Sequence, residues 1–184
     1  MRNFLASVSM GIAVLLSGCN TTPFDRATIY YDRTQFATQV KTDFPEIQSP
    51  ILQHGRCSLI VSTPGSTTGT YHFCTFALSQ DEIYVLGWDA STLKYTELLR
   101  LGLSSLSKVA YDSYFRTSQV QLMETRRQSA LSVMIDDGGY HDTAATEKLY
   151  ESIKKHGVSV AKSEGMMAPP PAPSPIILPV VIPR

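Results

Sequence analysis

The chain has 184 residues with 16 basic and 16 acidic side chains, and this length suits one domain with flexible ends. The balanced charge gives no electrostatic reason to expect binding to nucleic acid or to an anionic membrane surface. No internal repeat appears, and beyond its first residues the chain has no apolar segment long enough to span a bilayer.

The first residues have the pattern of a secretory signal. Arg2 supplies a positive charge, and residues 4–16 form a short, largely apolar stretch without charge. About 20 apolar residues are needed to cross a bilayer, so this stretch predicts a cleaved leader and not a membrane span.

Leu16, Ser17, Gly18 and Cys19 end this stretch and resemble the lipobox of bacterial lipoproteins. The resemblance implies cleavage between Gly18 and Cys19, a thioether-linked diacylglycerol on Cys19, and acylation of the new amine, as with palmitate. Two or three acyl chains hold a protein where one does not. Asn20 stands where an aspartate would signal retention at the inner membrane, which implies the periplasmic face of the outer membrane. The alternative is an ordinary secretory signal with a cysteine there by chance.

The predicted organisation has four parts: a signal peptide over residues 1–18, a lipidated tether over 19–54, a β domain with a C-terminal helix over 55–160, and a Pro-rich tail over 161–184. The tether is polar with scattered aromatic residues, and we expect it to dock partly on the domain. Residues 34–42 predict a short helix within it.

The sequence becomes strand-like from Gly55 onward, with β-branched and aromatic runs separated by short polar turns. The runs cover residues 56–62, 70–78, 83–88, 93–101, 106–111, 119–123 and 130–135. This spacing predicts a mainly β fold, a small antiparallel barrel or sandwich of six to seven strands.

Cys57 and Cys74 remain unpaired once Cys19 carries lipid. An even pair in an exported chain predicts a disulfide. A hairpin centred between Gly65 and Ser66 would place position 57 opposite position 74. The bridge would close a loop of about 18 residues, which stabilises by roughly 3 kcal/mol in the chain-entropy model.

One amphipathic helix is predicted after the strands. Asp142 or Thr143 can cap its first turn, and Gly157 provides a left-handed end. Apolar residues recur every four positions at Ala145, Leu149 and Ile153.

Six or seven strands followed by one helix resemble the pleckstrin-homology superfold, including its GRAM-type and bacterial relatives, from about residue 57 to residue 157. The segment FALSQDEIYVL, residues 76–86, looks like the turn between early strands of those domains. The resemblance implies that Leu149 and Ile153 plug the open end of the barrel. The loop at residues 63–69 carries no lysine or arginine, so phosphoinositide binding of the kind found in that superfold is not expected.

Candidate chemistry is sparse. His54 and His72 lie near the two cysteines in the sequence and would allow a two-Cys, two-His metal site, but the disulfide is the preferred interpretation of the cysteine pair. His141 beside Asp142 allows a general base, yet helix capping explains the same residues. No Gly-x-Ser-x-Gly elbow appears. We therefore expect no catalytic residue, no metal and no cofactor.

The tail is compositionally distinct. Seven of the 11 prolines lie at or after Pro169, which predicts an extended polyproline II segment. Its apolar end, residues 176–182, could add to a sheet edge of a partner or of its own domain. A loosely docked terminus without a role is the alternative.

These features together predict a lipid-anchored, non-enzymatic protein-binding or scaffold module with an envelope protein as partner. The alternative is a carrier or sensor that holds a small hydrophobic or envelope-derived ligand in the barrel. A hydrolase acting on the cell envelope is a third, weaker hypothesis.

Overall fold

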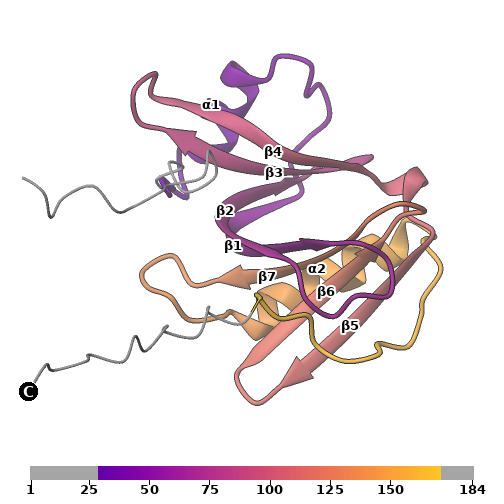
Figure 1. The fold of residues 1–184 in the computed structure, drawn as a ribbon. Helices are drawn as coiled ribbons and strands as arrows, with labels where there is room; N and C mark the ends of the chain where they lie inside the picture. Colours follow the sequence, from indigo (N-terminus) through magenta and orange to yellow (C-terminus); the bar gives the residue numbers. More distant parts are fainter. Residues whose placement is uncertain (1–28, 171–184) are drawn as a thin grey trace, which may run out of the picture.

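Seven antiparallel strands form one sheet in the computed structural model, which describes residues 29–170 (Figure 1). Their spatial order is β4-β3-β2-β1-β7-β6-β5. The strands are β1 (Gln53–Ser62), β2 (Thr70–Leu78), β3 (Glu82–Asp89), β4 (Lys94–Gly102), β5 (Lys108–Tyr114), β6 (Thr117–Met123) and β7 (Gln128–Met134). A 3-10 turn, η2 (Leu103–Ser105), follows β4.

The sheet folds over at β1, its central strand, which pairs with both β2 and β7. Figure 1 shows β3 and β4 in a layer above β5 and β6. Within residues 29–170, β4 and β5 lie at the two ends of the strand order, so the sheet is not closed into a barrel. The predicted fold class is confirmed: mainly β, antiparallel, seven strands and one C-terminal helix.

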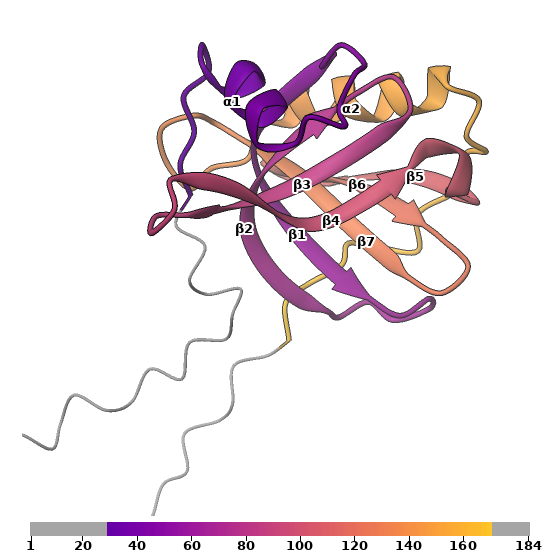
Figure 2. The same cartoon turned by 90° about the horizontal axis from the view of Figure 1, so that it is seen from above.

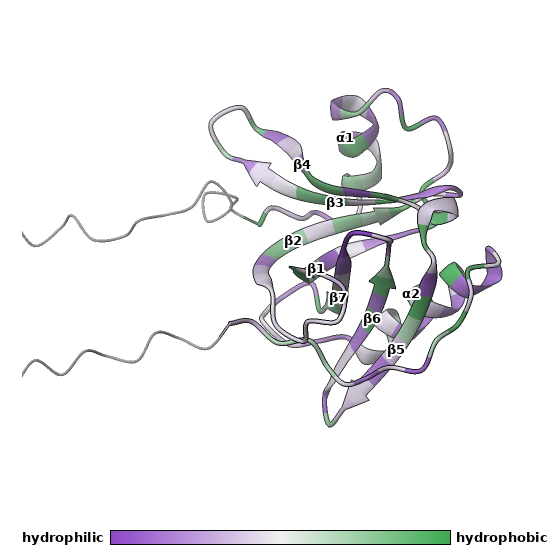
Figure 3. Ribbon diagram, turned by 45° about the vertical axis from the view of Figure 1, so that its right-hand side comes forward, coloured by the Kyte–Doolittle hydropathy of each residue, from purple (hydrophilic) through white to green (hydrophobic). Residues whose placement is uncertain are grey.

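The helix α2 (Thr143–Lys155) begins and ends as its sequence predicts. The Asp142 carboxylate accepts a hydrogen bond from the Ala145 backbone N–H, and Gly157 has a φ of 84°. Leu149 and Ile153 are fully buried in the main core between the two layers. That core draws residues from every strand, and its hydrophobic segments on β3 and β6 are green in Figure 3.

The outer face of β2, β3 and β4 is covered by α1 (Phe36–Asp43), which lies alongside β3 and β4 in Figure 2. Phe36 and Val40 are buried there against Tyr84 and Leu86, while Ile83 and Val85 face the main core. Because β3 is buried on both faces, its sequence is a continuous apolar run and does not alternate.

Residues 158–168, which we name the C-terminal strap, cross the other half of the sheet after α2. Val109 of β5 donates its backbone N–H to the Ser159 carbonyl of the strap, and Ala161 of the strap donates its N–H to the Val109 carbonyl, each at 2.8 Å. The Gln119 side chain donates to the Met167 carbonyl at 2.8 Å and accepts from its N–H at 2.9 Å. Met167 is thereby buried against Ile60 and Ala130.

Two strand boundaries differ from the sequence prediction. The strands expected at residues 106–111 and 119–123 are present as β5 and β6, but β5 continues to Tyr114 and β6 begins at Thr117, so the two form a tight hairpin that turns at Phe115, where φ is 55°. Leu93, expected at the start of a strand, lies in the turn before β4 with a φ of 54°. Positive φ is uncommon for non-glycine residues, and turns of this kind are usually recognised in a sequence by a glycine. Here the positions are occupied by leucine and phenylalanine, so the sequence does not indicate the turns.

No helix among residues 29–170 has both the length and the apolar character needed to cross a membrane.

Candidate functional site

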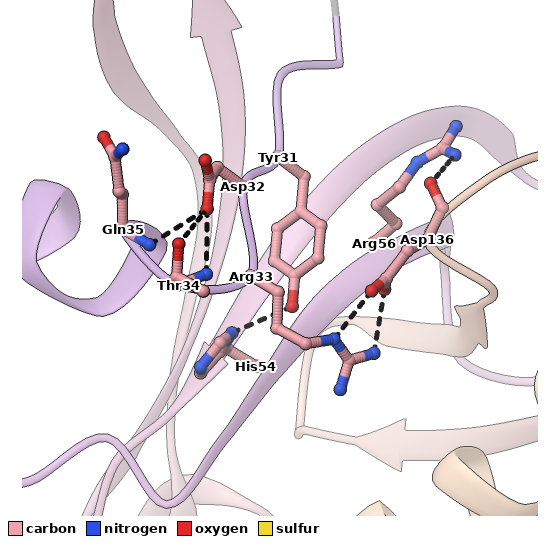
Figure 4. A network of polar contacts seen from close by, with 8 residues as sticks. All are labelled: Tyr31, Asp32, Arg33, Thr34, Gln35, His54, Arg56 and Asp136. Carbon is pink, nitrogen blue, oxygen red and sulfur yellow. Dashed lines mark hydrogen bonds and ion pairs between the residues drawn. The ribbon is translucent and has the colours of Figure 1, made fainter.

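The segment that precedes β1 docks on the sheet through a polar network, drawn in Figure 4. Arg33 forms a two-pronged ion pair with the Asp136 carboxylate, at 2.6 and 2.9 Å. Arg56 donates to the Asp136 main-chain carbonyl at 2.5 Å. Asp136 follows β7, so these contacts join the segment to the central strands across 103 residues of sequence.

Asp32 shapes the turn into α1. Its Oδ1 accepts hydrogen bonds from the Thr34 hydroxyl, the Thr34 N–H and the Gln35 N–H (Figure 4). These bonds stabilise the charged carboxylate and lower its pKa. Asp32 therefore acts as an Asx-turn residue at the start of the helix.

His54 lies under this segment, on the outer face of β1. Its Nδ1 is 3.0 Å from the Tyr31 hydroxyl, and its ring stacks on Phe36 with centroids 5.1 Å apart. Burial lowers the pKa of His54 and raises that of Tyr31. A neutral imidazole that bonds a phenol and stacks on a phenyl ring has a structural role here.

An aromatic pocket of about 370 Å³ opens between α1 and the β3–β4 hairpin. Its lining consists mainly of large apolar side chains with two amides: Tyr30, Gln35, Phe36, Gln39, Trp88, Leu93 and Tyr95. The Tyr30 and Trp88 rings are 4.6 Å apart, and those of Trp88 and Tyr95 are 5.0 Å apart. We name this feature the aromatic pocket.

The pocket walls are held by hydrogen bonds. The Tyr95 hydroxyl donates to the Tyr30 carbonyl at 3.0 Å, and the Tyr95 N–H donates to the Asp43 carboxylate at 2.9 Å. Gln39 donates to the same carboxylate at 3.0 Å. Burial raises the pKa of Tyr95, so its hydroxyl remains a donor at physiological pH. The pocket therefore has a fixed shape and can accept an apolar side chain or a short extended segment.

The two cysteines lie where the hairpin register places them. Cys57 on β1 is directly opposite Cys74 on β2, both are buried, and their sulfur atoms are 2.8 Å apart as free thiols. Burial raises the pKa of the Cys57 thiol. The disulfide remains a prediction, and Gly18 and Cys19 lie outside the described residues.

His54 does not join the cysteines. Cys57 faces the main core, whereas His54, three residues earlier, contacts Tyr31 on the outer face of β1. Within residues 29–170 no group of three or more histidine, cysteine or acidic side chains is placed to hold a metal ion. Asp142 caps α2, as the capping interpretation has it, and burial lowers the pKa of its neighbour His141.

The aromatic pocket was missed by sequence reasoning. Trp88 is only partly buried and lines the pocket with Tyr30 and Leu93. The alternation of side chains along β3 could have indicated it. Trp88 is an even-numbered residue like Tyr84 and Leu86, so its side chain lies on the same outer face of the sheet.

No family model matches this chain, and no curated protein matches it in sequence. Among solved structures it is similar to the hSac2 domain from human phosphoinositide phosphatase Sac2. The identity is 12%, the match covers 76% of this chain and 95% of that domain, and the TM-score is 0.44. Similarity at this level says nothing about activity.

Proposed function

We propose that this chain is a lipid-anchored cell-envelope lipoprotein, held at the periplasmic face of the outer membrane through acyl chains on Cys19. Its β domain binds another envelope protein and catalyses no reaction. The aromatic pocket is the observation that carries this proposal.

The pocket has the composition of a protein-binding site. Tyrosine and tryptophan are enriched at interface hot spots, where a large ring supplies contact area and a polar tip. Tyr30 is 43% exposed and Leu93 is 66% exposed, so apolar surface is available at the rim. Gln35 and Gln39 on α1 add amide groups that can bond the backbone of an extended segment.

The packed interior also favours a surface site over a ligand held between the layers. Side chains from all seven strands and α2 contact one another in the main core, whereas the aromatic pocket lies on the outer face. A partner that inserts one apolar or proline side chain into the pocket fits this arrangement.

The proposed anchor lies near the pocket along the chain. Tyr30 follows Cys19 by eleven residues, which span at most about 40 Å when fully extended. A partner in or on the same membrane is therefore within reach of the pocket.

Photo-crosslinking in intact envelopes tests the site. A photoreactive residue at Leu93, on the pocket rim, should give one discrete adduct with an envelope protein. Phe115 is the matched control, because it is also an exposed apolar turn residue with a φ of 55°, compared with 54° at Leu93. Tyr30→Ala, which removes the ring that packs against Trp88, should abolish the Leu93 adduct. Equal adducts from both positions, or a Leu93 adduct that survives Tyr30→Ala, would contradict the proposal.

Metabolic labelling with a clickable palmitate analogue tests the anchor separately. The chain should incorporate label and partition with outer membranes, and Cys19→Ser should lose both properties. Retention of label in Cys19→Ser would rule out Cys19 as the lipid attachment site.

A further inference from the structure

β2 has one edge that is only half paired. Its nine residues pair with β1 without a register shift, but β3 pairs only with Thr75–Leu78. The first part of β2, residues 70–74, therefore meets no strand on the β3 side within residues 29–170.

The backbone groups on this edge belong to odd-numbered residues. At one end Gly69 donates its N–H to the Ala168 carbonyl at 3.2 Å, and at the other Ser79 donates to the Glu82 carbonyl at 2.8 Å. Backbone groups in a strand alternate between its two edges. Tyr71 and Phe73 thus present their N–H and C=O groups to this edge, between two stretches that are already bonded.

The C-terminal strap reaches the edge in a parallel orientation. Ala168 forms a parallel bridge with Thr68, donating its N–H to the Thr67 carbonyl at 2.9 Å and accepting from Gly69. The chain after Ala168 starts in the direction of β2. In the structure the pairing ends there, since Pro170, the next residue whose nitrogen faces β2, has no N–H to donate.

The sequence that follows matches continued pairing. In a parallel ladder from Ala168, every second residue directs its N–H toward β2, which selects positions 170, 172 and 174. Ala172 and Ser174 have an N–H, and the prolines at 169, 171, 173 and 175 fall on positions whose nitrogens face away. Proline is tolerated on an edge strand when its nitrogen faces solvent.

The side chains agree with the same register. Pairing of residue 168 with residue 68 places Pro171 beside Tyr71 and Pro173 beside Phe73. The Phe73 ring is 48% exposed and meets the Tyr71 ring edge-on, with centroids 5.0 Å apart. Exposed aromatic rings are the surfaces on which proline-rich segments pack.

We propose that residues 169–174 of this chain form an added, parallel edge strand beside Tyr71 and Phe73 of β2. Pairing resumes at Ala172, whose N–H donates to the Tyr71 carbonyl and whose C=O accepts from the Phe73 N–H. The tail thereby covers the open edge of its own domain.

Amide hydrogen exchange, measured residue by residue by NMR, tests this edge strand. The full chain is compared with a variant that ends at Ala168, which keeps every contact of the C-terminal strap. In the full chain the Phe73 N–H should exchange on the order of tenfold more slowly than in the shortened chain. The Cys74 N–H faces β1 and should not change, so it serves as an internal control.

A composition-matched variant tests the register. The double variant Ala172→Pro with Pro173→Ala keeps the length and composition of the tail but moves its N–H by one position, so that the N–H faces away from β2. It should expose the Phe73 N–H as fully as the shortened chain does. Protection of Phe73 that is the same in all three chains would overturn the proposal. Protection that rises with protein concentration, together with a dimer in solution, would assign the edge to the tail of a second copy and overturn it as well.

Discussion

Cys57 and Cys74 face each other across the first hairpin, buried in the main core with their sulfur atoms 2.8 Å apart. The hairpin midpoint between Gly65 and Ser66 is sufficient to predict this pairing, because antiparallel register is set by the turn. The pair therefore needs only an oxidant to become a covalent link between β1 and β2.

The first prediction is that the exported chain contains this disulfide. Oxidation should raise the free energy of unfolding by roughly 3 kcal/mol, since the bridge closes a loop of about 18 residues. Urea unfolding with and without reductant measures the difference. The double variant Cys57→Ser with Cys74→Ser should be insensitive to reductant. Alkylation of both thiols in unreduced, denatured protein would show that the bridge is absent.

The second prediction concerns pH. Burial lowers the pKa of His54, so the unfolded chain takes up a proton as the pH falls through about 6.5, whereas the folded chain takes it up only at a lower pH. Stability should be full above the ordinary histidine pKa and fall as the pH drops toward the lowered folded value. His141 shifts in the same direction and adds to the slope. In urea unfolding between about pH 5 and pH 8, His54→Gln should flatten the slope.

His156→Gln is the control for that experiment. His156 is exposed at the end of α2, where its Nδ1 lies 2.7 Å from the Ser152 carbonyl. A slope that is the same in wild type and in His54→Gln would show that His54 does not contribute.

The third prediction concerns Asp136, which joins the segment before α1 to the end of β7. Asp136→Asn should cost at most about 1 kcal/mol in global stability, because the Arg33 side chain is largely exposed. Its main effect should be faster tryptic cleavage after Arg33, since the neutral amide cannot form the ion pair and can accept only one of the two hydrogen bonds from the guanidinium. Asp137→Asn is the matched control. Equal cleavage rates in the two variants would contradict a docking role for Asp136.

The fourth prediction concerns the buried cluster between α1 and the outer face of the sheet, which is separate from the main core. Phe36→Ala should destabilise by about 3–5 kcal/mol, the range for truncating a buried phenylalanine, because Phe36 is 1% exposed. The loss should be concentrated in α1, whose amides should exchange faster while those of Val120 and Leu122 in the main core remain protected. Uniform loss of protection would show that α1 and the cluster around Phe36 do not open independently of the main core.

Most of the fold could be predicted from the sequence because its signals are local. Each strand is a β-branched or aromatic run between polar turns, and α2 has its Asp142 cap and its Gly157 end. The aromatic pocket could not be predicted in this way. Tyr30, Trp88 and Tyr95 come from three separate segments, and only tertiary packing brings them together. The C-terminal strap could not be predicted either. Side chains such as Gln119 supply several of its hydrogen bonds, so it is not a regular strand and its sequence has no hydrophobic periodicity.

The path of the C-terminal strap constrains the order in which the contacts of the domain can form during folding. Ala168 bonds to Thr67 and Gly69, a hundred residues earlier, and Val109 bonds to Ser159 and Ala161. Contacts of such long sequence separation form late, because the closure entropy of the intervening loop must be offset first. A nascent chain interrupted before Met167 would leave Ile60 and Ala130 without the side chain that covers them. The last part of the domain to be synthesised thus covers a surface formed jointly by its first strand, β1, and its last strand, β7.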